Sequence, residues 1–113
     1  MKAMIRICAV SIFASVLGTM SAAAGETGIA NIHAWVQVGK KICIKDHWHY
    51  GNSMGLGSKR AAEIAAIKSW EGFVAFEYGD DWANFAKASS KSMKCTAPYK
   101  GTWSCDLNAR PCR

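Results

Sequence analysis

The clearest hydrophobic pattern lies between residues 58 and 78. Apolar side chains recur there every three or four positions, the spacing of one face of an α-helix: Ile64, Ile67, Trp70, Val74 and Tyr78. Phe73 and Phe76 widen this stripe. Ser58 is a suitable N-cap, and Gly79 can adopt the left-handed backbone that ends a helix. We therefore predict a long amphipathic helix over 58–78 with its apolar stripe buried.

Two other segments alternate between apolar and polar residues, the period of a β-strand with one buried face. The first covers 29–38 and is followed by a turn and a short strand over 42–44. The second is C-terminal, where Pro98–Gly101 separates two alternating runs and indicates a β-hairpin. Residues 46–58, which contain several glycines, are predicted to be a loop. The predicted fold class is α+β: one long amphipathic helix packed with an N-terminal strand region and a C-terminal disulfide-bearing β-hairpin.

The first 24 residues are typical of an export signal. Lys2 and Arg6 precede an apolar run over 7–17, and Ala22–Ala24 supply the small residues of a cleavage site. The run is shorter than the roughly 20 residues that cross a bilayer. We predict a signal peptide at 1–24, a single small exported domain at 25–113, a periplasmic or secreted location, and no membrane span after cleavage.

Composition agrees with one small globular domain. The chain has 113 residues, of which 50% are hydrophobic and 19% charged, which excludes a fibrous repeat or an extended disordered chain. Cleavage removes two basic residues and no acid, so the formal charge falls from +6 to +4. A domain this small buries only a modest core, and natural domains of this size are commonly stabilised by disulfides.

Four cysteines follow the signal: Cys43, Cys95, Cys105 and Cys112. An even number in a small exported chain predicts two disulfides. A three-residue hairpin loop over 99–101 places Cys95 opposite Cys105. A four-residue loop that starts at Pro98 places Cys95 opposite Ser104 instead, and Pro98 suits that longer turn. We favour Cys95–Cys105 with Cys43–Cys112, and the sequence leaves the other pairings open.

One set of residues carries a family resemblance. It consists of Ser58-Lys59, Ala61-Ala62, Ala65-Ala66-Ile67, Trp70, Tyr78-Gly79, Trp82, Phe85, Ala88, Lys91, Cys95, Trp103, Cys105, Ala109 and Pro111-Cys112-Arg113, together with the segment Asp46–Gly51. This pattern resembles an uncharacterised group of small exported alphaproteobacterial proteins. The resemblance implies export and disulfide bonding, and it implies no activity or catalytic residue.

His47 and His49 are the candidate metal ligands. Two residues apart on an extended segment, they project to the same side, and two imidazoles on one side can begin a zinc or copper site. Asp46 could join them or orient a ring, and His33 could supply a third ligand. Paired surface histidines that only hydrogen-bond a loop are the simpler alternative, and no fourth ligand is evident when the cysteines are oxidised.

Trp48 and Tyr50 are the candidate ligand-binding aromatics. The chain has five tryptophans, and Trp70 falls on the helical stripe and is expected in the core. Trp48 lies between two histidines beside Tyr50 and is the best candidate for an exposed ring. Exported modules that bind glycans use such rings, whereas a small domain also gains stability by burying them.

Charge is distributed unevenly along the chain. Residues 40–60 and 84–113 are basic, and the segment between them is acidic. A basic hairpin could bind an anionic envelope polymer or an acidic protein, although a solvated surface is the simpler explanation. Nucleic acid is not expected as a partner, because the excess is modest and no binding motif is present.

The sequence contains no Gly-x-Ser-x-Gly elbow, glycine-rich phosphate loop or His-Glu-x-x-His motif. We therefore predict a protein that is not an enzyme and needs no cofactor: an accessory or binding module for an anionic envelope or protein partner. The alternative is a metal-binding protein that holds zinc or copper through His47 and His49.

Overall fold

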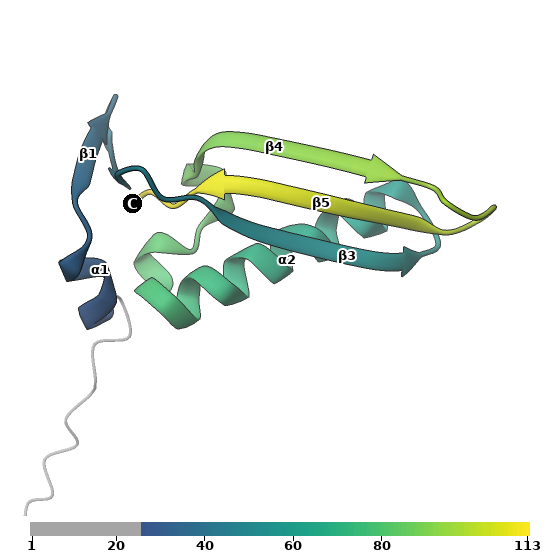
Figure 1. Ribbon diagram of the computed structural model, residues 1–113, viewed down its shortest axis with the longest axis horizontal. Coiled ribbons are helices and arrows are strands. Elements are labelled where there is room, and N and C mark those ends of the chain that lie inside the picture. Colours follow the sequence, from purple (N-terminus) through teal and green to yellow (C-terminus); the bar gives the residue numbers. More distant parts are fainter. Residues whose placement is uncertain (1–25) are drawn as a thin grey trace, which may run out of the picture.

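The computed structural model describes residues 26–113, so the predicted signal peptide lies outside the described residues. Figure 1 shows a short N-terminal unit beside a larger layer of one helix and three strands. The elements follow in the order α1 (Gly28–Ile32), β1 (Trp35–Val38), β2 (Lys41–Ile44), β3 (His49–Leu56), α2 (Lys59–Tyr78), η1 (Asp80–Trp82), η2 (Phe85–Lys87), β4 (Ser89–Thr96) and β5 (Trp103–Arg110).

The main layer is an antiparallel sheet in the order β3-β5-β4, and α2 packs along one of its faces (Figure 1). On the central strand, Cys105, Leu107 and Ala109 are buried and alternate with more exposed residues. These three side chains join the buried face of α2 in the core. The predicted α+β class, with a long helix packed on a C-terminal hairpin, is confirmed.

Helix α2 begins and ends where the sequence predicts. The Ser58 hydroxyl accepts a hydrogen bond from the Ala61 amide at 3.1 Å, which caps the first turn. At the other end Gly79 has a φ of 104° and donates its amide to Ala75. The buried stripe recurs every fourth residue: Ala62, Ala66, Trp70, Val74 and Tyr78.

The stripe is rotated relative to the predicted one. The predicted burial of Trp70, Val74 and Tyr78 is confirmed. Ile64, Phe73 and Phe76 are exposed instead, and Phe76 retains 86% of its accessible surface. The prediction was wrong there because it weighted large apolar side chains. Two alanines occupy the first half of the buried face instead, and their small size lets α2 lie close to the sheet.

Strand β3 approaches α2 closely at Gly51. A Cβ atom at this position would overlap the carbonyl oxygen of Ala66 and lie 2.7 Å from the backbone nitrogen and Cβ of Trp70. Only glycine fits there without a shift of the backbone. At this point the backbone of β3 therefore packs directly against α2, with no side chain of β3 between them.

The predicted loop over 46–58 is wrong, because most of it forms strand β3. Its inward-facing residues are His49, Gly51 and Ser53, none of which is strongly apolar, while Tyr50 points outward and is 73% exposed. The usual apolar alternation is therefore absent. The Ser53 hydroxyl instead bonds the backbone, accepting from the Cys105 amide at 3.1 Å and lying 2.7 Å from the Ala62 carbonyl oxygen.

The N-terminal strand region is shorter than predicted. Residues 28–32 form the short helix α1, so the predicted strand over 29–38 is wrong in its first half and correct for β1. Strand β1 pairs with β2, as expected for the two short runs. Strand β2 in turn bonds the end of the chain, where the amides of Ile42 and Arg113 each donate to the other's carbonyl oxygen.

Both favoured disulfides are present. The Cys95–Cys105 bond, here the hairpin disulfide, joins directly opposed residues of β4 and β5. The loop has the shorter length, because Gly101 adopts a φ of 79° and closes the turn. The Cys43–Cys112 bond, here the terminal disulfide, spans a sequence separation of 69.

The two disulfides indicate a non-reducing, extracytoplasmic compartment, because cytosolic thiols are normally kept reduced. Between residues 26 and 113, none of the helices has the length and apolar character needed to cross a membrane.

Candidate functional site

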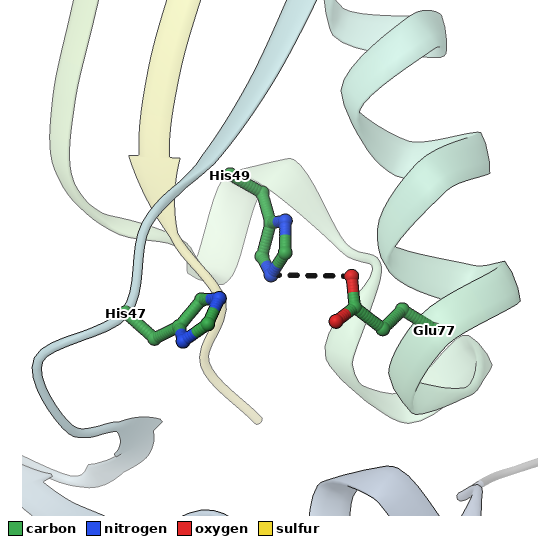
Figure 2. Close-up of side chains that lie close together, drawn as sticks. All are labelled: His47, His49 and Glu77. Atoms are coloured by element: carbon green, nitrogen blue, oxygen red, sulfur yellow. Dashed lines mark ion pairs between the residues drawn. The ribbon is translucent and has the colours of Figure 1, made fainter.

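The two predicted metal ligands meet the end of α2. His49 opens strand β3 and is buried, and His47 precedes it in the connecting segment. Because the two residues alternate along an extended chain, their rings project to the same side and stack with centroids 4.9 Å apart. Glu77, near the C-terminal end of α2, points toward them, as Figure 2 shows.

His47, His49 and Glu77 form what we call the His/Glu cluster. One ligand atom from each residue lies within 4.8 Å of the others. Nε2 of His49 is 3.6 Å from a carboxylate oxygen of Glu77 (Figure 2). Ligand atoms around a tetrahedral zinc ion are about 3.3 Å apart. The three side chains therefore need only a modest inward movement to share one ion.

Two predicted helpers lie outside the cluster. His33, expected as a third ligand, packs edge-on against His47 with ring centroids 4.9 Å apart. Its Nδ1 lies 2.8 Å from the Ile29 carbonyl oxygen. Asp46 is not part of the cluster either. Glu77 from α2 is the third residue of the cluster instead, and His33 packs against the ring of His47.

Tyr78 shares a hydrogen bond with His49. Its hydroxyl oxygen is 2.7 Å from Nε2 of His49. Burial, and then the negative charge of Glu77, raise the pKa of Tyr78 well above its usual range. The hydroxyl therefore stays protonated, and the direction of its hydrogen bond with Nε2 follows from which ring nitrogen of His49 carries the proton.

His49 is neutral at neutral pH. Burial lowers its pKa below 6.5; Glu77 opposes this shift, and His47 and His33 add to it. The 3.6 Å contact with Glu77 becomes a full ion pair only when His49 is protonated. A metal ion requires the neutral imidazole, so the environment already holds His49 in the form that can bind one.

The cluster lines an open cavity of about 440 Å³. We call this cavity the aromatic pocket, and its lining consists of His47, Trp48, His49, Tyr50, Phe73 and Glu77. The two predicted ligand-binding aromatics thus share one cavity with the two predicted metal ligands. Trp48 is 37% exposed, so part of its ring is available to a ligand.

Sequence reasoning missed Glu77, Tyr78 and Phe73 as site residues. All three lie in the last two turns of α2, and the sequence placed Phe73 and Tyr78 on the core stripe. Their role depends on strand β3, which the sequence did not predict. The sequence did offer one signal. Glu77 directly precedes Tyr78, the last residue of the buried stripe, so it lies at the edge of the surface that packs on Tyr78.

Two arginines contact tryptophan rings within the domain. The Arg110 guanidinium lies over the Trp48 ring at 5.3 Å, and its Nε donates to the Ser89 hydroxyl at 2.9 Å. Arg113 lies over the rings of Trp35 and Trp82, at 4.6 Å and 5.0 Å. Part of the positive charge therefore packs against tryptophans, and an anionic partner stays a prediction.

No protein-family model, curated protein or solved structure matches this chain.

Proposed function

We propose that the protein is an exported, non-enzymatic metal-binding module that holds a divalent transition ion, zinc or copper, through the His/Glu cluster. The observation that carries the proposal is the approach of three ligand atoms, from His47, His49 and Glu77, to within 4.8 Å of one another. The sequence identified the two histidines, and the fold adds a carboxylate that is distant in the chain.

The donor chemistry favours zinc or copper over a hard cation. Two imidazoles and one carboxylate are typical ligands of these ions, whereas calcium and magnesium take mainly oxygen ligands. One carboxylate offsets half of the charge of a divalent ion. Burial lowers the pKa of His49, so an ion does not have to compete with a charged imidazolium at neutral pH.

Binding requires one local exchange. An ion bound at Nε2 of His49 replaces the hydrogen bond that this nitrogen shares with the Tyr78 hydroxyl at 2.7 Å. Tyr78 is fully buried at the end of the core stripe, so its ring stays in place while its hydroxyl gives up this bond. The remainder of the cluster has two partly exposed members, which leaves a path for the ion from solvent.

A periplasmic or secreted location fits both disulfides and the proposed site. The broader expectation, an accessory module with an anionic envelope or protein partner, is compatible with metal binding. Binding to anionic cell-wall material that weakens steeply with salt would support that partner.

The test is titration of the purified mature protein with zinc and with copper, followed by calorimetry and elemental mass spectrometry. We expect one ion per chain, and we expect His47→Ala and Glu77→Gln each to weaken binding at least tenfold. Glu63→Gln is the matched control, because Glu63 lies on the same helix outside the cluster. Circular dichroism verifies folding. Unchanged affinity in both cluster variants would refute the proposal.

A further inference from the structure

The sheet of β3, β5 and β4 has an outer face, which points away from α2 and from the His/Glu cluster (Figure 1). Tyr50 and Asn52 lie on this outer face, because they alternate with the inward-facing residues of β3. Trp48 belongs to the same side, since its ring lies against Arg110, which follows the inward Ala109 on β5. We infer that the outer face binds a neutral glycan chain. This inference goes beyond the proposed function and does not depend on a bound metal.

Trp48 and Tyr50 provide two aromatic rings on one side of the strand. They retain 37% and 73% of their accessible surface. Two residues along an extended chain span about 7 Å, so the rings can contact neighbouring sugars of one glycan. Tryptophan and tyrosine offer the apolar face of a sugar a large contact area and lose little conformational entropy on binding. Because β3 is an edge strand, both residues also border the aromatic pocket, although their rings belong to the outer face.

Polar side chains continue the row beyond the two rings. Asn52 follows on β3, and Asn108 and Asp106 on β5 lie directly opposite Tyr50 and Asn52. Amide and carboxylate groups suit the hydroxyls of a sugar, which both donate and accept hydrogen bonds. Within residues 26–113, the side-chain oxygen of Asn108 is buried and has no hydrogen-bond partner. Its amide can therefore rotate without losing a bond at that oxygen and present an acceptor to a ligand.

A cavity of about 360 Å³ follows the row of polar side chains, and its volume is typical of small-ligand sites. It is lined by Asn52, Ser53, Met54, Ser104 and Asp106. Asn52 thus belongs both to the row and to the cavity. A glycan that stacks on Trp48 and Tyr50 reaches the cavity with its next sugars, so one extended ligand contacts both features.

The charges on the outer face favour a neutral ligand. Lys94 on β4 lies directly opposite Asp106 on β5, so their charges offset each other. The Arg110 guanidinium lies over Trp48 at 5.3 Å and donates through Nε to the Ser89 hydroxyl at 2.9 Å. These contacts hold the Trp48 ring in place, so the ring loses little conformational freedom when a ligand binds. A neutral glycan needs flat apolar surface and hydrogen-bonding groups rather than charge of one sign, and this face provides both.

The test is calorimetric titration of the purified mature protein with two neutral hexasaccharides, cellohexaose and chitohexaose, and with the anionic hexagalacturonate. EDTA is present, so that no metal ion contributes. We expect a neutral hexasaccharide to bind, and Trp48→Ala and Tyr50→Ala each to weaken its binding about tenfold or more. Phe76→Ala is the matched control and should bind like the parent, because Phe76 is 86% exposed but lies on α2. Circular dichroism verifies folding of each variant.

Three results would overturn the inference: binding of neither neutral hexasaccharide, parental affinity in both Trp48→Ala and Tyr50→Ala, or binding of hexagalacturonate alone. The last result would assign the outer face to an anionic partner. This inference and the proposed function fail separately. Tyr50→Ala should keep zinc binding, and Glu77→Gln should keep glycan binding.

Discussion

Gly51→Ala is expected to destabilise the domain strongly. The added methyl group would overlap the Ala66 carbonyl oxygen and lie 2.7 Å from two backbone-proximal atoms of Trp70. These atoms belong to the backbone of α2 or are bonded directly to it, so they cannot rotate away. The strand and the helix must therefore move apart. Overpacking typically lowers the free energy of unfolding by about 1–3 kcal/mol, and a backbone obstacle favours the upper end. At about 4–8 °C per kcal/mol, the melting temperature falls by roughly 12–24 °C.

Thermal unfolding followed by circular dichroism, with both disulfides intact, measures this change. Gly72→Ala is the matched control, because a Cβ at that position in α2 meets nothing within 4 Å. Alanine is the better helix former by about 1 kcal/mol, so the control should melt at the same temperature or higher. A Gly51→Ala protein that melts within about 3 °C of the parent would show that β3 and α2 do not approach this closely.

Three further outcomes follow from single contacts. Tyr78→Phe keeps the ring and removes the hydroxyl that competes for His49, so calorimetry should show zinc affinity about two- to tenfold higher; lower affinity would contradict that competition. In the metal-free protein the pKa of His49 is lowered by folding, so the unfolded state takes up a proton before the folded state does as pH falls. The free energy of unfolding should therefore decrease below pH 6.5. Urea unfolding from about pH 8 to 5 should show this decrease, and the decrease should be smaller in His49→Gln. Removing the terminal disulfide by Cys43→Ala/Cys112→Ala should lower the free energy of unfolding by about 4 kcal/mol, and removing the hairpin disulfide should lower it by roughly 3 kcal/mol. The terminal disulfide has the larger effect because it closes the longer loop. The reverse order in chemical unfolding would refute this entropic explanation.

The predictable part of the fold is the part encoded by local pattern. Helix α2 has a capping serine, a periodic apolar stripe and a terminal glycine, so both its existence and its bounds could be predicted. The hairpin has alternation on both strands, and its register became certain only with Gly101 in the turn. Strand β3 has none of these signals, because its inward positions are held by His49, Gly51 and Ser53. Its pairing with β5 is long-range, and no periodicity rule detects it.

The site was predictable to the same extent. The spacing of His47 and His49 is a local feature, and it correctly indicated two imidazoles on one side. Glu77 is 28 positions further along the chain and becomes a neighbour only because β3 packs along α2. His33 was the expected third ligand because it is near in sequence and was assigned to a strand. The structure places it at the end of α1 instead, where it supports His47.

The contact at Gly51 also positions the site, so a substitution that disturbs this contact is expected to weaken metal binding as well as stability. His49 and Gly51 lie on the same face of β3, two residues apart, so a strand that moves away from α2 at Gly51 carries His49 away from Glu77. Measured well below its melting temperature, where the chain is folded, Gly51→Ala should bind zinc about tenfold or more weakly, the size of effect seen when supports of metal ligands are removed. Gly72→Ala should bind zinc like the parent. A folded Gly51→Ala protein with parental zinc affinity would mean that the ligands are positioned by something other than this strand–helix contact.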